Sequence, residues 1–274
     1  MAHNLDKYFE TVLKITKEAG KIIRQRIWDV KTVQTKSSAI DFVTEVDQQV
    51  EKFIIDDITS HFPDHKFIGE ESSAEGHKIT LTDDPTWIID PIDGTMNFVH
   101  GYPNICISIG LLVNKVTEIG IIYNPVLEQL FTARKGQGAF YNDKPIHVSG
   151  KKVISEALLA MEFGSSRDPE KMRVVQENVK ILYPLAHGMR SVGSAALNMA
   201  NVALGGIDGY FEMGIHAWDM AAGDIIVREA GGVVIDPTGS PFDLMSGKVL
   251  CAASLELAQQ LSATVKQYTP SRDN

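Results

Sequence analysis

Residues 87–98 read Trp87-Ile88-Ile89-Asp90-Pro91-Ile92-Asp93-Gly94-Thr95-Met96-Asn97-Phe98. The apolar residues before Asp90 are typical of a buried strand that ends there. Pro91 and Gly94 predict a sharp change of chain direction. The two carboxylates, three positions apart, are followed directly by the backbone N–H groups of Gly94 and Thr95. Such a loop can hold a metal ion beside a phosphate group.

The composition is that of an ordinary globular chain. Its 274 residues are 44% hydrophobic and 22% charged, which predicts a substantial core in one large α/β domain or two modest ones. No apolar run approaches the ~18 residues of a membrane span, and the first residues lack the basic-then-apolar order of a signal peptide. Cys106 and Cys251 lie in apolar runs, which predicts buried free thiols and a cytoplasmic protein.

The charge balance limits the classes of partner. The formal net charge is −9 and no basic stripe interrupts it, which argues against nucleic-acid binding. A polyanionic substrate would also be repelled, unless bound divalent cations reverse the local charge. An acidic chain and a phosphate substrate are therefore compatible through metal ions.

Hydrophobic spacing predicts the elements of the first half. It indicates an amphipathic helix over residues 5–27, a loop over 29–43 centred on Lys36-Ser37-Ser38, and a second helix from near Thr44, where Thr44-Glu45-Val46-Asp47 resembles a capping box. A short strand is expected over 66–71, so that Glu70 and Glu71 close it. A largely antiparallel meander should follow, with strands at 105–113, 116–124, 129–134 and 138–141 and a turn at Asn142-Asp143-Lys144-Pro145.

The pattern changes after residue 150 to alternating strands and helices. Strands are predicted at 157–161, 186–190, 207–212, 233–235 and 249–253. Helices are predicted at 168–181, 193–204, 219–230 and 255–267, and the tail 269–274 is expected to fray. The fold class is therefore mixed α/β, in the α+β sense, with packed layers of sheet and helix.

Covalent-nucleophile and dinucleotide motifs are missing from the sequence, and acids remain as the candidate chemistry. Oxygen ligands of this kind suit Mg²⁺ better than zinc. Each acid also has a structural interpretation that stays open. Asp219 could be a helix N-cap, Asp47 a capping acid and Asp93 part of a turn, while Glu70 and Glu71 could form a solvated strand end.

A known pattern links these acids. Asp90-Pro91-Ile92-Asp93-Gly94-Thr95, with Gly69-Glu70-Glu71 before it and Trp218-Asp219-Met220-Ala221-Ala222-Gly223 after it, resembles the inositol monophosphatase family. The likeness spans nearly the whole chain. It implies a single domain over residues 1–274 with a layered α-β-α-β-α sandwich. Its halves would be an antiparallel-sheet and metal half, roughly 1–150, and a polyol-binding half, roughly 151–274.

The resemblance also implies roles for individual residues. Glu70, Asp90 and the Ile92 carbonyl would bind one Mg²⁺, and Asp90, Asp93 and Asp219 a second, with a weaker third ion near Glu70. Thr95 and Asp47 would orient and deprotonate the attacking water, which makes Thr95, Asp47 and Glu70 the expected catalytic residues. The expected substrate contacts are Asp93, Gly94, Thr95, Ser165, Gly193, Ser194, Ala195, Ala196, Glu212 and Asp219.

The family resemblance implies Mg²⁺-dependent hydrolysis of myo-inositol monophosphates, in support of inositol recycling and phosphatidylinositol signalling. Mn²⁺ is a possible substitute, and Li⁺ and Ca²⁺ are expected inhibitors. A homodimer is also implied. The alternatives are a broader sugar-phosphate or nucleotide phosphatase of the same superfamily, a non-catalytic regulatory relative, and a plain metal-binding module. The intact acids and the Thr95–Asp47 pair argue against the last two.

Overall fold

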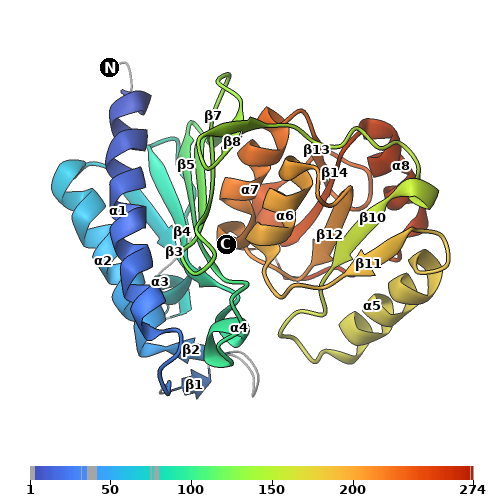
Figure 1. Cartoon of the computed structure of the whole chain (residues 1–274), viewed down its shortest axis with the longest axis horizontal. Helices are drawn as coiled ribbons and strands as arrows, with labels where there is room; N and C mark the ends of the chain where they lie inside the picture. The colour runs from blue at the N-terminus through green and yellow to red at the C-terminus, as the bar shows by residue number, and fades with distance from the viewer. Residues whose placement is uncertain are drawn as a thin grey trace.

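The chain folds into five alternating layers of helix and sheet (Figure 1). The structure is a computed structural model that describes residues 4–31, 33–35, 42–74, 76, 80–271 and 273. The arrangement confirms the α-β-α-β-α sandwich expected from the sequence. None of the helices in the described ranges combines the length and the apolar character that a membrane crossing requires.

The first outer layer consists of helices α1 (Leu5–Arg26) and α2 (Glu45–His61). Both present an apolar face to the first sheet, and their side chains join Trp87 and Ile89 of the sheet in one hydrophobic cluster. Because the carboxylate of Asp47 lies in the first turn of α2, packing of this helix on the sheet also fixes a candidate catalytic group.

The first sheet is antiparallel except for its first pair of strands. Its strands, in spatial as well as chain order, are β3 (Lys66–Gly69), β4 (Thr86–Asp93), β5 (Cys106–Val113), β6 (Val116–Asn124), β7 (Gln129–Arg134), β8 (Ala139–Tyr141) and β9 (Lys144–Ile146). The predicted antiparallel meander is therefore confirmed. All eight residues of β4 are buried, which places Asp90 and Asp93 in the interior.

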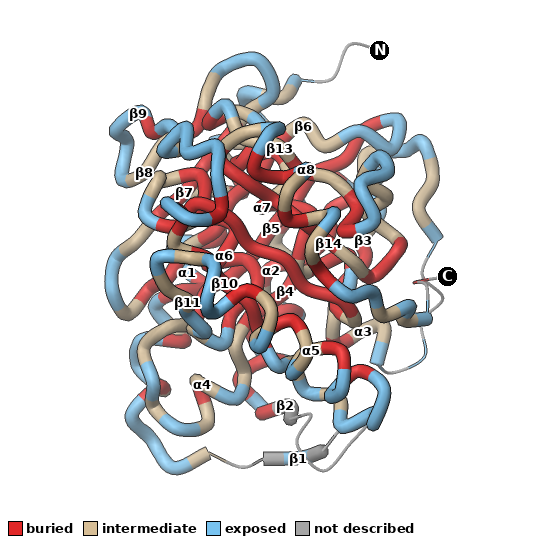
Figure 2. The backbone as a smooth tube through the Cα atoms, turned by 90° about the vertical axis from the view of Figure 1, so that its right-hand side faces the viewer, coloured by how far each residue is buried: buried red, intermediate tan, exposed pale blue. Residues whose placement is uncertain are grey.

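Helices α6 (Ala195–Leu204) and α7 (Ala217–Glu229) form the middle layer. They are mostly buried, and α7 runs through the centre of the molecule (Figure 2). Glycines in the first sheet allow α7 to lie very close, since a Cβ added at Gly110 would lie 2.8 Å from the Ala221 Cβ, and one at Gly120 would lie 2.6 Å from the Ala222 carbonyl oxygen. This approach brings the first turn of α7 beside β4.

The second sheet lies beyond the middle layer and contains five strands. Its strands are β10 (Leu158–Met161), β11 (Gly188–Arg190), β12 (Gly209–Met213), β13 (Val233–Ile235) and β14 (Lys248–Ala252), in the order β11-β10-β12-β14-β13. Helices α5 (Pro169–Leu182) and α8 (Leu255–Thr264) cover its outer face and form a separate hydrophobic cluster with it. The division into 1–150 and 151–274 remains a prediction about domains, although the two sheets fall on either side of it.

Two local expectations for the loops are wrong. The expected loop over 29–43 contains two short antiparallel strands, β1 (Val33–Thr35) and β2 (Phe42–Thr44), whereas Lys36-Ser37-Ser38 lies outside the described residues. Lys144 and Pro145 belong to β9 and not to a turn. A proline is tolerated there because β9 is an edge strand.

Three element ends also differ from the prediction. Glu70 and Glu71 do not close a strand but begin the short helix α3 (Glu70–Ala74). The predicted helix over 255–267 ends at Thr264, because Val265 has extended backbone angles. The tail is not frayed at Asp273, which is buried and whose N–H donates a 3.1 Å hydrogen bond to the Met245 carbonyl.

Candidate active site

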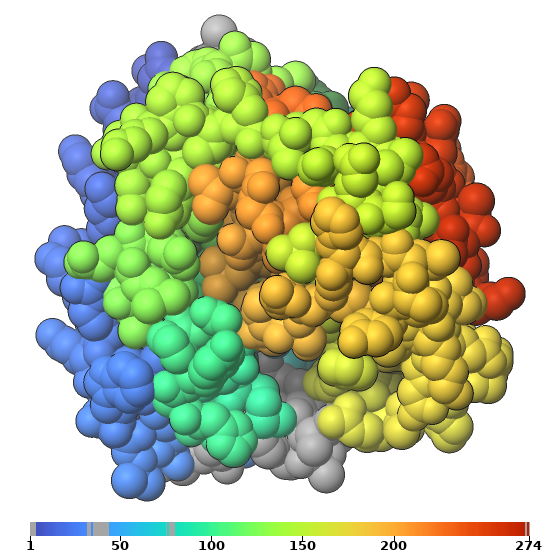
Figure 3. Space-filling model, turned by 45° about the vertical axis from the view of Figure 1, so that its right-hand side comes forward, coloured from blue at the N-terminus to red at the C-terminus, as the bar shows by residue number. Residues whose placement is uncertain are grey.

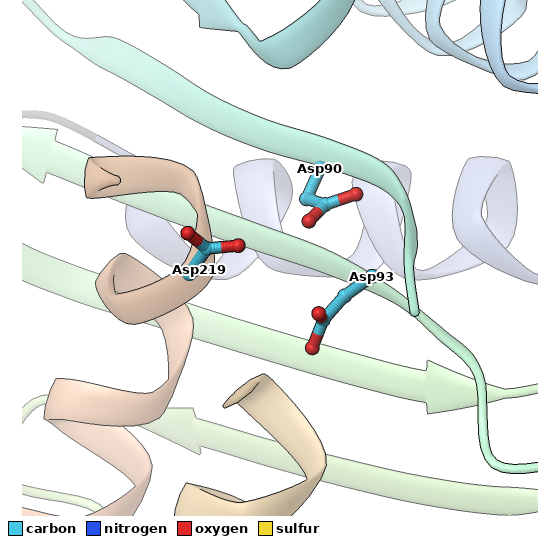
Figure 4. A group of neighbouring side chains, drawn as sticks. All are labelled: Asp90, Asp93 and Asp219. Atoms are coloured by element: carbon cyan, nitrogen blue, oxygen red, sulfur yellow. The ribbon is translucent and has the colours of Figure 1, made fainter. Parts of the chain in front are cut away.

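Three aspartates from two elements converge in the interior (Figure 4). Asp90 and Asp93 come from β4 and Asp219 from the first turn of α7. One carboxylate oxygen from each lies within 4.8 Å of the other two. Asp90 and Asp93 are buried and Asp219 is half-buried. Three acids this close repel one another when ionised, unless a cation lies among them.

The pKa values of these acids reflect their burial first and that repulsion second. Burial raises the pKa of Asp90 well above 3.8, and the charges of Glu70, Asp93 and Asp219 raise it further. Burial raises the pKa of Asp93 to about 6, against hydrogen bonds from Ser194 and Ala196 that lower it. The pKa of Asp219 is also raised, by burial and then by Asp93. Deeply buried carboxylates at this spacing fit a hard divalent cation.

The bend between Asp90 and Asp93 is a bulge and not the sharp turn expected at Pro91. Strand β4 continues to Asp93, and its pairing with β5 shifts register between the two aspartates. The Asp90 carboxylate holds the bulge by accepting a 2.9 Å hydrogen bond from the Ile92 N–H. Bulges of this kind often re-aim side chains at active sites.

Gly94 follows the bulge in a conformation that requires glycine. Its φ angle is +95°, and a Cβ added there would lie 3.0 Å from the carbonyl oxygens of both Asn104 and Gly193. The short helix α4 (Thr95–Val99) begins directly after it. The chain therefore reverses tightly enough to place Thr95 against α2.

Among the described residues, Asp47 binds two neighbours, one with each oxygen. Its Oδ2 accepts hydrogen bonds from the N–H and hydroxyl of Thr44, which completes the predicted capping box of α2. Its Oδ1 accepts a 3.0 Å hydrogen bond from the Thr95 hydroxyl. Thr95 Oγ1 also lies 3.1 Å from the Ile92 carbonyl oxygen. The structural interpretation and the catalytic one are therefore compatible in the same side chain.

Asp219 repeats this arrangement on α7. The helix begins at Ala217 with His216 as its N-cap, so the interpretation of Asp219 as the N-cap is wrong. Asp219 lies three positions further on, and its Oδ2 accepts a 2.6 Å hydrogen bond from the His216 N–H. One oxygen of the carboxylate thus fixes the helix end, as in Asp47, while the other faces the aspartate cluster.

Glu70 stands at the edge of the cluster in the first turn of α3. It is close enough to Asp90 to raise the pKa of that carboxyl group. Helix α3 is oriented by another acid, Glu51 of α2. The buried Glu51 carboxylate accepts 2.8 Å hydrogen bonds from the N–H groups of Glu71 and Ser72. Sequence reasoning missed Glu51, although its place on the apolar face of α2 was a signal.

The first turn of α6 supports Asp93 from the opposite side. Asp93 Oδ2 accepts hydrogen bonds from the Ser194 hydroxyl at 2.6 Å and from the Ala196 N–H at 2.7 Å. Gly193, Ser194, Ala195 and Ala196 therefore lie beside the cluster, where substrate contacts were expected. The buried thiol of Cys106 lies 3.8 Å from the same Oδ2 atom. Both cysteines are free and buried, as predicted.

Glu162 of the second half was missed by sequence reasoning. Its Oε1 accepts hydrogen bonds from the N–H groups of Val192 and Gly193 and from the Asn198 side chain, at 2.7, 3.0 and 2.7 Å. It thereby ties the chain before α6 to β10. An isolated glutamate after an apolar strand gave no sign of these partners, because they lie about 30 residues away.

The remaining predicted contacts, Ser165 and Glu212, come from the second half of the chain. Glu212 is buried near the end of β12, with its Oε2 accepting a 2.5 Å hydrogen bond from the Tyr210 hydroxyl. Ser165 is exposed on the segment between β10 and α5. In Figure 3 orange atoms near the centre lie recessed between the green segments on the left and the yellow segments on the right.

Asp273 is a further residue that the sequence did not reveal. Its Oδ1 lies 2.7 Å from the ring Nδ1 of His216, and its Oδ2 accepts a 2.8 Å hydrogen bond from the Ala217 N–H. The C-terminal tail therefore fastens the start of α7, two residues before Asp219. The polar, charged sequence of the tail is otherwise typical of a solvated end.

The similarity to known proteins extends over nearly the whole chain. The sequence profile of the inositol monophosphatase family matches residues 4–269. Human inositol monophosphatase 1 is 48% identical over 275 residues, which cover 100% of this chain and 99% of the relative. The chain belongs to the inositol monophosphatase family. Proteins of this family are metal-dependent phosphatases, and the chain is accordingly a phosphatase whose three aspartates can bind a metal.

Solved structures of inositol monophosphatase relatives share the fold. The extragenic suppressor protein suhB from Bartonella henselae has a TM-score of 0.86 at 30% identity, and the alignment covers 95% of this chain and 99% of that one. The inositol monophosphatase from Anabaena has a TM-score of 0.82 at 34% identity, with 96% of each chain covered. Both likenesses extend over nearly the whole of this chain.

Proposed function

We propose that this chain hydrolyses myo-inositol monophosphates to myo-inositol and phosphate, with Mg²⁺ as its cofactor. The observation that carries the proposal is the convergence of Asp90, Asp93 and Asp219 beside the hydrogen-bonded Thr95–Asp47 pair. Family membership across the whole chain supports the substrate class. A simple metal-binding module would not need the Thr95–Asp47 pair.

The donor set fits Mg²⁺. Glu70, Asp90, Asp93, Asp219 and the Ile92 carbonyl offer oxygen atoms only, from buried or half-buried positions. We assign these groups to two ions, with Asp90 shared and a third, weaker ion near Glu70. When bound, the ions lower the pKa of water toward neutrality and neutralise the charge of the phosphate and the leaving group.

The protein's own part in activating water lies with Thr95. When its hydroxyl donates to Asp47 Oδ1, rather than to the Ile92 carbonyl, the Thr95 oxygen is left to accept a hydrogen bond from the attacking water. Asp47 is held by the start of α2, where an ionised carboxylate is favoured. As water attacks phosphorus, the proton can pass toward Thr95 and Asp47, which act together as the general base.

The phosphate and the polyol would occupy the two sides of this centre. The N–H groups of Gly94 and Thr95 are assigned to the phosphoryl oxygens, because donors fixed in the backbone stabilise developing negative charge. Ser165, residues 193–196 and Glu212 are assigned to inositol hydroxyls, with Asp93 and Asp219 nearby. The two sheets would therefore divide the substrate between them.

Several finer assignments belong to the same proposal. We expect a homodimer in the cytoplasm, activity with Mn²⁺ in place of Mg²⁺, and inhibition by Li⁺ and Ca²⁺. Li⁺ resembles Mg²⁺ in size but carries half its charge, so it should fit the second ion's position and slow phosphate departure. Light scattering after size exclusion tests the dimer, and activity in millimolar Li⁺ tests the inhibition.

The alternative is a broader phosphatase of the same superfamily that also accepts sugar phosphates or nucleotides. Kinetics on inositol, fructose, glycerol and nucleotide phosphates distinguish the two. We expect the highest kcat/KM for an inositol monophosphate. A higher value for a fructose or nucleotide phosphate would favour the alternative, while no Mg²⁺-dependent phosphate release from any of them would reject both.

A further inference from the structure

Lys171 occupies an unusual position for a lysine. Among the described residues it is the one lysine that is almost fully buried, with 3% of its surface exposed. It lies in the first turn of α5, where its N–H donates a 2.8 Å hydrogen bond to Asp168 Oδ1. A positive charge is unfavourable at a helix N-terminus, and burying an ammonium costs free energy. The stability of α5 alone therefore does not account for Lys171.

The ammonium lies where three segments of the second half meet. It donates a 3.2 Å hydrogen bond to the Gly214 carbonyl oxygen, just after β12. A Cβ added at Gly164 would lie 2.6 Å from Lys171 Nζ and 3.5 Å from Glu212 Oε1. Because Gly164 has no side chain, the Lys171 ammonium faces the Glu212 carboxylate across the space that a Cβ would occupy. Lys171, Glu162 and Glu212 together form the charged part of a small cavity at this place.

The two oxygens of Glu212 have different surroundings. Oε2 is held by the Tyr210 hydroxyl at 2.5 Å, whereas Oε1 is directed toward Gly164, next to Ser165. Apart from Lys171, the described charged groups that act electrostatically on Glu212 are the acids Glu162 and Asp93. Burial raises the pKa of Glu212 to about 7, and Lys171 opposes that rise.

We propose that Lys171 is a specificity-determining residue whose ammonium increases the charged fraction of the Glu212 carboxylate, so that Oε1 accepts a hydrogen bond from a substrate hydroxyl. This proposal rests on the proposed function, which assigns Glu212 to an inositol hydroxyl. A protonated Glu212 would offer a donor in place of one acceptor. Lys171 itself touches no substrate in this account and acts through Glu212.

The test compares Lys171→Met with the wild-type chain in saturating Mg²⁺. If losing the ammonium raises the Glu212 pKa by about one unit, the ionised fraction at pH 7 falls from about a half to about a tenth. The KM for inositol 1-phosphate should then rise about fivefold, while kcat changes less than about twofold. Lys180→Met, at an exposed position on the same helix, is the matched control and should change neither value.

Three further measurements separate this role from a merely structural one. The ratio of the two KM values should approach one at pH 9, where Glu212 ionises without help. Other titratable groups also act on the two residues. They are Glu162, Asp93 and Tyr210 around Glu212, and Asp219, Asp168 and Arg167 around Lys171. Because both proteins contain all of them, the ratio of the two KM values reports the effect of the ammonium. The KM for 4-nitrophenyl phosphate, which lacks polyol hydroxyls, should not change. In a Glu212→Gln background, Lys171→Met should add less than a twofold effect.

The outcomes distinguish the two proposals. An unchanged KM in Lys171→Met, or an equal additional effect in the Glu212→Gln background, would overturn the role of Lys171. Wild-type protein that hydrolyses 4-nitrophenyl phosphate but not inositol 1-phosphate would instead overturn the proposed function. Thermal unfolding of each variant shows that the comparison is made between folded proteins.

Discussion

The Thr95 hydroxyl donates a 3.0 Å hydrogen bond to Asp47, although the two residues lie 48 positions apart. The contact depends on a bulge in one strand and on the capping box of a helix in another layer. The same carboxylate thus supports a helix end and the hydroxyl that we propose is catalytic. Removing it has consequences for both stability and turnover, which can be measured separately.

Thr95→Ala should lower kcat for inositol 1-phosphate by about 10²-fold or more with little change in KM, because proton transfer is lost and binding is not. Asp47→Asn should lower kcat similarly and also weaken the cap of α2. Thr95→Ser keeps the hydroxyl and is the control that should retain most of the activity. Near-normal turnover in both the alanine and the asparagine variant would contradict the proposed proton path.

Asp273→Ala should weaken activation by Mg²⁺, although Asp273 is not one of the proposed metal ligands. It removes two hydrogen bonds from the start of α7, a loss of about 1 kcal/mol. If that loss falls on the position of Asp219, the Mg²⁺ concentration for half-maximal activity rises by up to about fivefold. Ser271→Ala, at an exposed position in the same tail, should leave the Mg²⁺ curve unchanged. Identical curves for both variants would show that the tail has no influence on the metal site.

Asp93 predicts a pH dependence of stability in the metal-free chain. Its pKa is raised from 3.8 to about 6 in the folded protein. A raised carboxyl pKa stabilises the fold at low pH, and this contribution is lost as the pH rises through about 6. Between pH 5 and 8 the free energy of unfolding should lose on the order of 1 kcal/mol from this group.

Denaturant unfolding of wild type and Asp93→Asn, both freed of metal, isolates that contribution. From pH 5 to pH 8 the wild type should lose more unfolding free energy than Asp93→Asn. Mg²⁺ should raise the wild-type Tm more at pH 8 than at pH 5, since the ion competes with protons for the carboxylates. A wild-type advantage that grows with pH in the absence of metal would contradict the assignment.

Glu162→Ala should cost about 2 kcal/mol of unfolding free energy, because it leaves the part-buried N–H groups of Val192 and Gly193 and the buried side-chain amide of Asn198 without their acceptor. Glu156→Ala removes an exposed carboxylate of the same segment and should cost less than about 0.5 kcal/mol. Urea unfolding measures both. Equal stability of the two variants would mean that Glu162 does not hold the chain before α6.

The sequence was most informative where local pattern and chemistry coincide. The layered fold follows from periodicity together with the family motifs, and the motifs also indicated Asp90, Asp93 and Asp219, which the structure brings together. The capping box at Thr44 and Asp47 was readable because its partners lie three residues apart. The roles assigned to these residues in metal and substrate binding remain predictions.

Residues that act through distant partners were not readable in this way. Glu51, Glu162 and Asp273 look like ordinary polar positions until the fold supplies the N–H groups they accept from. The bulge in β4 was likewise misinterpreted as a turn, because its neighbour β5 sustains pairing beyond Pro91. Local propensity cannot express such tertiary constraints.

The most direct test of the account is phosphate release from inositol 1-phosphate by the wild-type chain, with and without Mg²⁺. We expect turnover that depends on Mg²⁺ and that is lost after chelation and restored by added Mg²⁺. Asp90→Asn should abolish it in the same assay, while the protein stays folded. Release that is unaffected by chelation, or no release at saturating Mg²⁺, would contradict the account.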